Sequence, residues 1–301
     1  MVITHTMCGL GNQMFQYAMG RAVAHRLGTP LKLDISSFGP GYTKRRFELD
    51  RFQIKAELAS PEEIRALTGL LGTRSGPKAE SIRGICRRLG ALGRFIIGAY
   101  VQEKHFHFDP TMLSVRGDVY LHGRWQSERY FSDIAAMLRD DFQMQRTENE
   151  DQEFTKRMTE NELSVSLHVR RGDYVTLSQQ GHVYTTLPME YYDEAVAYMR
   201  RELGRPRFFI FSDEPLWVQD SFHMEDATGV SLSGSDKGPR ELTLMTKCRH
   251  HIIANSTFSW WGAWLSSQKD GIVCAPQRWF APEEQRRRCM DDLLPATWIR
   301  L

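Results

Sequence analysis

The sequence predicts an α/β fold with two Rossmann-like domains, each built on a parallel sheet, that face each other across a cleft. Strand-like apolar runs alternate with helical stretches through the second half of the chain, and one strand, turn, helix and strand unit opens the first half. With 301 residues, of which 41% are hydrophobic, the chain is long enough to fill two cores of ordinary size.

The opening unit places a glycine-rich turn between a strand and a helix. Residues 2–7 are predicted to form the strand, and an amphipathic helix runs from Asn12 to Leu27 before Gly28, which suits the position after a helix end. Residues 31–35 form the next predicted strand. A helix that starts directly after glycines offers its backbone N–H groups to an anion.

The same unit also resembles the start of an NAD-binding domain. A dinucleotide fingerprint needs a third glycine near position 14, where this chain has Met14, although Asp34 lies at the distance expected of a ribose-binding acid. The missing glycine weighs against an NAD-type oxidoreductase, which stays as an alternative.

The second half alternates regularly between the two kinds of element. The expected strands are 163–169, 207–211, 229–233, 251–254 and 271–275, and the expected helices are 189–203, 214–222, 239–249 and 257–267. A polar, acidic stretch precedes this series, so we expect an N-terminal domain over 1–155 and a C-terminal domain over 156–301. The last helix is expected to pack back on the N-terminal domain.

Charge and cysteine content narrow the range of partners and compartments. The formal net charge is +2, so no global field recruits nucleic acid. Five cysteines without a C-x-x-C pair suggest reduced thiols in a cytoplasmic protein. The basic segment 74–94 is either a solvated helix face or a peripheral contact with anionic lipid at the inner face of the membrane.

Two adjacent arginines mark the strongest candidate site. Arg170 and Arg171 emerge where the predicted strand 163–169 meets a loop, and ligands of open α/β sheets bind at that edge. A guanidinium offers a planar fork of donors that matches a diphosphate. The alternative is that the pair is structural and bound to nearby carboxylates such as Asp173.

Three further candidate motifs fall at strand-to-helix junctions. Each contains residues that suit a helix N-cap, and the last offers more hydroxyl and amide groups than one cap needs, which suits phosphate. Trp260, Trp261 and Trp264 follow at helical spacing and are expected to pack into the core. The three motifs are Gly11-Asn12, Ser212-Asp213-Glu214 and Asn255-Ser256-Thr257.

No metal or cofactor site is expected. The sequence has no D-x-D motif and no histidine pair at the spacing of H-E-x-x-H. If a nucleotide diphosphate leaves during a reaction, its charge would then be met by Arg170, Arg171 and backbone donors.

Several of these motifs, taken in order, resemble the α-1,2-fucosyltransferases of glycosyltransferase family 11. The resemblance implies a GT-B architecture, GDP-fucose held mainly by the C-terminal domain, an acceptor site mainly in the N-terminal domain, and an inverting transfer that needs no metal. The matching segments are Gly9–Ala18, Gly123–Phe131, His168–Tyr174, Phe211–Glu214 and Asn255–Leu265.

The resemblance also suggests roles for individual residues. Arg170 would bind the donor phosphates with support from Arg171, and Asn12 would face the donor from the other domain. Glu128 and Asp34 are the first candidates for a general base, but a helix start or salt bridge for Glu128 and a strand-end cap for Asp34 are the favoured explanations, and a transfer without a base stays open. The remaining donor-site candidates are Gly11, His168, Asp173, Ser212, Asp213, Glu214, Asn255, Ser256 and Thr257.

By the same resemblance, the acceptor is a galactose-terminated oligosaccharide of a surface polysaccharide or O-antigen, free or lipid-linked. A different nucleotide sugar or linkage remains open at this point. So does a nucleotide-sugar-binding module without catalytic activity.

Overall fold

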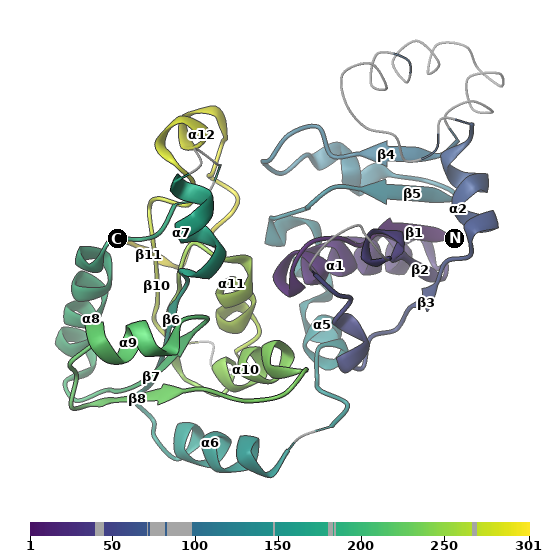
Figure 1. Ribbon diagram of the computed structural model, residues 1–301. Coiled ribbons are helices and arrows are strands. Elements are labelled where there is room, and N and C mark those ends of the chain that lie inside the picture. The colour runs from purple at the N-terminus through teal and green to yellow at the C-terminus, as the bar shows by residue number, and fades with distance from the viewer. Residues whose placement is uncertain are drawn as a thin grey trace. The chain divides into compact units, whose positions relative to one another are not determined.

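The computed structural model describes residues 1–39, 45–70, 72, 82, 98–146, 148–179, 183, 185–266 and 270–301. Contacts divide the chain into two compact units, the first of Met1–Leu49 and Ile54–Asp141, the second of Asp50–Gln53 and Phe142–Leu301 (Figure 1). The predicted boundary after residue 155 falls inside helix α6 (Asn149–Thr159) of the second unit. The basic segment 74–94 lies outside the described residues except for Ile82.

The first unit is built on a parallel sheet of five strands in the order β3-β2-β1-β5-β4. Every pairing in this sheet is parallel. The strands are β1 (Val2–His5), β2 (Leu31–Asp34), β3 (Glu57–Leu58), β4 (Tyr100–Gln102) and β5 (Val119–His122). The described helices are α1 (Leu10–Leu27), α2 (Pro61–Thr68) and α5 (Ala135–Asp141), with short 3-10 turns η1 (Ser36–Phe38), η3 (Pro110–Ser114), η4 (Glu128–Tyr130) and η5 (Ser132–Ile134). The 3-10 turn η2 (Leu49–Arg51) begins with the last residue before the Asp50–Gln53 segment of the second unit.

Helix α1 is the central helix of this unit and is buried over most of its length. Gly20 lets it approach the sheet, since an added Cβ would lie 2.8 Å from Leu31 Cδ1 and 3.1 Å from Thr4. The helix ends as predicted at Gly28, which has a φ of 60°. Its start differs from the prediction, because the N-cap residue is Gly9 rather than Asn12.

The second unit is built on a parallel sheet of six strands in the order β11-β10-β9-β6-β7-β8. The strands are β6 (Ser164–Val169), β7 (Arg207–Ser212), β8 (Ala227–Val230), β9 (His250–Ile252), β10 (Val273–Ala275) and β11 (Ile299–Arg300). The helices are α6 (Asn149–Thr159), α7 (Gly172–Gln179), α8 (Met189–Leu203), α9 (Pro215–Ser221), α10 (Lys237–Met245), α11 (Thr257–Trp264) and α12 (Pro282–Arg287).

Alternation along the central strands fills a core on each face of this sheet. Phe208 and Ile210 pack with α8 and α9, whereas Phe209 and Phe211 pack with α6 and α10. Helices therefore cover both faces (Figure 1). The two parallel sheets confirm the α/β class and the pair of Rossmann-like domains.

The predicted strands and helices of this half are all present, although their ends move by a few residues. The largest shift is at the end of α10, which stops at Met245 and not at residue 249. Strand β8 begins at Ala227 beside Phe208, so residues 231–233 belong to the loop before α10. Trp260 and Trp261 are fully buried, which confirms their packing role. The sequence did not predict α6, α7, α12 or β11.

Among the described residues, no helix is long and apolar enough to cross a membrane.

A buried ion pair joins α6 to α10. Arg240 Nη2 lies 2.8 Å from Asp151 Oδ1, and the two side chains are 6% and 9% exposed. The Nη1 group of Arg240 also donates to the Ser233 carbonyl at 2.9 Å, in the loop after β8. One guanidinium thus fixes the first turn of α6 and this loop to α10.

Arg240→Met should lower the free energy of unfolding by about 3–5 kcal/mol, because it leaves the Asp151 carboxylate buried without its partner. Urea denaturation would measure the loss. The matched control is Arg200→Met, which breaks the more exposed pair with Asp226 and should cost about 1 kcal/mol or less. Equal effects of the two substitutions would show that burial does not set the strength of the Arg240–Asp151 pair.

Candidate active site

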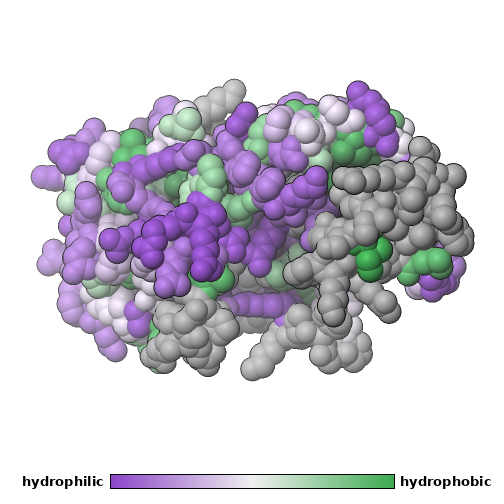
Figure 2. Space-filling model, turned by 90° about the horizontal axis from the view of Figure 1, so that it is seen from above, coloured by the Kyte–Doolittle hydropathy of each residue, from purple (hydrophilic) through white to green (hydrophobic). Residues whose placement is uncertain are grey.

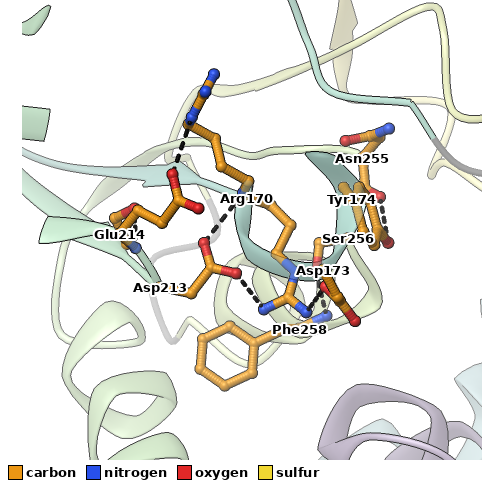
Figure 3. A network of polar contacts seen from close by, with 10 residues as sticks. Arg170, Asp173, Tyr174, Asp213, Glu214, Asn255, Ser256 and Phe258 are labelled. Carbon is orange, nitrogen blue, oxygen red and sulfur yellow. Dashed lines mark hydrogen bonds and ion pairs between the residues drawn. The ribbon is translucent and has the colours of Figure 1, made fainter. Parts of the chain in front are cut away.

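Three of the predicted motifs meet at one edge of the second sheet. Strands β9, β6 and β7 are neighbours in that sheet and run parallel. The segments that follow their carboxyl ends are 255–257, 168–174 and 212–214. Their side chains lie close together in Figure 3. This is the edge at which open α/β sheets bind ligands.

Arg170 is held between two carboxylates. Its Nη1 lies 2.8 Å from Asp213 Oδ2, its Nη2 forms an ion pair with Asp173, and its side chain is 20% exposed. The guanidinium carbon of Arg170 lies 5.3 Å from the centroid of the Tyr174 ring. The pairing with Asp173 considered from the sequence is therefore present. A guanidinium has five N–H donors, so these contacts leave others for a phosphate.

Arg171 anchors the loop that carries Arg170. Its backbone N–H donates to Asp213 Oδ1 at 3.0 Å, and its Nε donates to Glu214 Oε2 at 3.2 Å. The guanidinium lies 3.9 Å from the centroid of the Trp217 ring. These contacts tie the loop after β6 to the loop after β7.

Gly172 permits this arrangement. A Cβ atom at this position would lie 2.3 Å from Asp213 Oδ2. The Asp213 carboxylate can therefore bind both the Arg170 side chain and the Arg171 backbone only because residue 172 has no side chain.

His168 contributes a neutral ring to the same edge. It is buried next to Phe258, with ring centroids 5.5 Å apart. Burial, helped by the charge of Arg170, lowers its pKa to about 3. Nδ1 has no hydrogen-bond partner within the described ranges. The ring is therefore uncharged at neutral pH, and its Nδ1 is enclosed.

Asn255 and Ser256 shape the start of α11. Asn255 is fully buried, and its Nδ2 donates to the carbonyls of Thr185 at 2.8 Å and Trp279 at 3.1 Å. Ser256 is the N-cap, accepting from the Phe258 N–H at 3.3 Å, and Thr257 is the half-buried first residue of the helix. The capping interpretation is thus confirmed for Ser256.

The loop after β7 is set by a local turn. Ser212 Oγ accepts from the Glu214 N–H at 3.0 Å, which places Asp213 and Glu214 toward the arginines. Glu214 is the N-cap residue of α9, without a side-chain cap bond. The capping role considered for Ser212 and Asp213 is therefore wrong, because the chain continues one residue further before the helix begins.

Sequence reasoning missed a buried carboxyl group near Asp213. Glu241 on α10 is 7% exposed, and its Oε1 lies 3.5 Å from Lys237 Nζ. Burial raises its pKa to about 7, with a further contribution from the charge of Asp213. In the sequence, this contact was indicated by the i,i+4 spacing of Lys237 and Glu241, which lie one helical turn apart.

The other four predicted residues belong to the first unit. Gly11 is buried in the first turn of α1, and Asn12 Oδ1 accepts from Gln126 Nε2 at 2.7 Å. Asp34 ends β2 and is 1% exposed. Its Oδ1 accepts from the Ser36 N–H at 2.9 Å, as a strand-end cap does, and Glu128 begins the 3-10 turn η4.

The described residues hold no group of three His, Cys, Asp or Glu side chains placed to bind a metal ion. Hydrophilic side chains predominate on the face drawn in Figure 2. The site can thus offer an anionic ligand a fixed guanidinium, a neutral imidazole and a helix N-terminus.

Solved structures give one further comparison. The structure of NodZ, an α-1,6-fucosyltransferase soaked with GDP-fucose, aligns over 88% of this chain and 91% of that chain with a TM-score of 0.46 and 17% identity.

Known sequences match the chain more closely. The O-antigen biosynthesis glycosyltransferase WbnK of Escherichia coli is 32% identical over 97% of this chain and 98% of that protein. An α-1,2-colitosyltransferase of Escherichia coli is 30% identical over 100% of this chain and 98% of its own length. A galactoside 2-α-L-fucosyltransferase of Bos taurus, SEC1, is 30% identical over 34% of this chain and 28% of its own. Residues 79–301 match the family model of Glycosyl transferase family 11, and the chain belongs to that family.

Proposed function

We propose that this glycosyltransferase moves L-fucose from GDP-β-L-fucose to the 2-hydroxyl of a terminal galactose, with inversion and without a metal ion. The observation that carries the proposal is Arg170, fixed by two carboxylates at the ligand-binding edge of the second sheet. The bovine relative, a galactoside 2-α-L-fucosyltransferase, supports this donor, acceptor and linkage.

In this proposal the second unit binds the donor. Arg170 and the N-terminus of α11, with Ser256 and Thr257, bind the diphosphate, and His168 lies near Arg170. Asp213 and Glu214 lie toward the nucleotide. As the anomeric bond breaks, charge grows on the departing GDP, and a guanidinium already held in place stabilises it without reorganising. Gly11 and Asn12, at the start of α1, would approach the donor from the first unit.

The biological acceptor would be a galactose-terminated unit of an O-antigen, free or lipid-linked. The WbnK relative is named for O-antigen biosynthesis, which supports this class. The reaction would then occur in the cytoplasm, at the inner face of the membrane, with the basic segment 74–94 as the part that touches lipid.

A second donor is supported by one relative. The α-1,2-colitosyltransferase matches the whole chain, and colitose is L-fucose that lacks the 3-hydroxyl. Both donors would present the same diphosphate to Arg170, so the choice between them depends on contacts with one sugar hydroxyl.

The purified protein, incubated in EDTA with GDP-fucose and a panel of β-galactosides, should release GDP and form a product heavier by one deoxyhexose. Product mass and GDP release are measured together, with GDP-colitose tested in parallel. Intact GDP-fucose with every acceptor, alongside turnover of GDP-colitose, would assign the second donor instead. Loss of activity in EDTA that an added divalent cation restores would contradict metal independence.

Arg170→Ala should weaken GDP binding and lower kcat/KM by about 10²- to 10³-fold, because it removes the positive charge that meets the leaving diphosphate. Calorimetric titration with GDP and steady-state kinetics measure the two effects. Arg200→Ala, at a surface arginine near the end of α8, is the control and should change neither. Unchanged GDP affinity in Arg170→Ala would contradict the proposed role.

Gly172→Ala should lower GDP affinity by about 10- to 100-fold, because the added Cβ displaces the Asp213 carboxylate that orients Arg170. The control is Gly229→Ala in β8, where an added Cβ meets no atom within 4 Å. Titration with GDP measures both variants, and wild-type affinity in Gly172→Ala would show that Asp213 does not orient the arginine.

A further inference from the structure

The carboxyl edge of the first sheet carries a second cluster of titratable side chains. His5 ends β1, Asp34 ends β2 and His122 ends β5, and these three strands are neighbours. His5 and Asp34 are register partners. This edge corresponds to the ligand-binding edge of the second sheet, but its chemistry is acid–base rather than cationic.

His5 is the member of this cluster with a buried ring nitrogen that lacks a partner in the described part of the chain. It is 8% exposed, and its Nε2 lies 2.7 Å from Ser37 Oγ. Its Nδ1 has no hydrogen-bond partner among the residues that the structure describes. Two further buried polar atoms also lack a partner within these residues. They are Thr6 Oγ1, directly after β1, and Trp125 Nε1, in the loop after β5. Buried polar atoms are nearly always paired, so the unpaired His5 nitrogen needs a partner from outside the described residues, a water molecule or a hydroxylated ligand.

Asp34 already accepts one hydrogen bond on each of its two oxygens. Oδ1 accepts from the Ser36 N–H at 2.9 Å, and Oδ2 accepts from the Tyr120 hydroxyl at 2.5 Å. The carboxylate is 1% exposed. His122 uses one of its two ring nitrogens, since its Nδ1 is hydrogen-bonded to the Tyr100 hydroxyl.

The surroundings of His5 favour a neutral ring that can accept a proton. Burial lowers its pKa below the usual 6.5, and the charge of Asp34 opposes that effect. The titratable groups that face the ring are Asp34 from β2 and Tyr120 and His122 from β5, with the His122 ring edge-on at 4.6 Å between centroids. With the proton on Nε2 donated to Ser37, the lone pair lies on Nδ1.

We propose that His5 is the general base of the transfer, that its Nδ1 takes the proton of the acceptor hydroxyl, and that Asp34 is a positioning residue that stabilises the protonated ring. This inference rests on the proposed function and adds the acceptor-side residue to it. An acceptor hydroxyl in contact with Nδ1 would satisfy the unpaired nitrogen.

The electron pair and the proton leave the reacting atoms in different directions. The acceptor oxygen forms a bond to the anomeric carbon while the bond from that carbon to the β-phosphate oxygen breaks, and the electron pair of the broken bond leaves with GDP. The hydroxyl proton moves to His5 Nδ1, which becomes an imidazolium beside the Asp34 carboxylate. The ring then returns the proton to water, and no oxidant, reductant or metal is needed.

The first test is His5→Gln in the full-length protein. An amide keeps a polar contact with Ser37 but is no base, so kcat should fall by about 10²- to 10⁴-fold while GDP affinity stays unchanged. The matched control is His25→Gln, an exposed histidine in the last turn of α1. It should behave as the wild type. A His5→Gln protein that is folded by circular dichroism, binds GDP and retains wild-type kcat would overturn the proposal.

The second test uses pH and does not depend on the His5 variant being stable. In the wild type, kcat/KM should fall as the pH drops through the pKa of His5, below 6.5, because the protonated ring accepts no proton. Asp34→Asn removes the charge that raises this pKa, so the decline in kcat/KM should occur at lower pH than in the wild type. On the plateau above that decline, kcat/KM should be about tenfold lower. If Asp34 has a purely structural role, Asp34→Asn would lower kcat/KM without changing the pH at which kcat/KM declines.

Two further results would overturn the assignment. A loss of about 10²-fold or more at every pH in Asp34→Asn would make the carboxylate itself the base. A loss in His122→Gln equal to that in His5→Gln would move the role to the neighbouring ring. Failure of the wild type to transfer any deoxyhexose would overturn the proposed function and this inference together, whereas wild-type transfer with an unaffected His5→Gln overturns this inference alone.

Discussion

The Asp213 carboxylate is the contact on which the donor-side arrangement depends. It receives the Arg170 guanidinium on one oxygen and the Arg171 backbone N–H on the other, and so joins the loops that follow β6 and β7. A charge-assisted bond to a backbone group holds position better than one between two long side chains, because less conformational entropy is lost in forming it. Gly172 leaves the space this carboxylate needs.

This arrangement explains how one arginine can be both fixed and available. Two carboxylates hold Arg170 in orientation, yet the side chain stays 20% exposed. Arg171, by contrast, lies against Glu214 and the face of Trp217, so it supports the loop. The adjacent His168 is kept neutral by burial, which avoids adding a further buried charge to this edge.

Both units use the same feature of parallel sheets for different chemistry. Strands that run in one direction end at one edge, so residues distant in the sequence meet there without a dedicated scaffold. In the second unit that edge carries arginines and a helix N-terminus, and in the first it carries His5, Asp34 and His122. Within the part of the chain that the structure describes, buried polar atoms without a partner occur at both edges, at His168 and Asn255 in one and at His5 in the other.

The amino-acid sequence alone determined the fold class, the strand and helix series of the second half, and the grouping of candidate residues at strand ends. These follow from local periodicity and from the rule that parallel strands share an edge. Helix α6 escaped prediction because its composition is polar, and only packing of Phe154 and Met158 against the sheet shows its apolar side.

Tertiary structure decided which partner each side chain has. Spacing could place Asp173 near Arg170, but the contact with Asp213 joins residues from two strands that pair only in the folded sheet. A linear pattern specifies which groups are at a strand end, whereas hydrogen bonding and burial, which set their chemistry, depend on atoms brought together from distant parts of the chain.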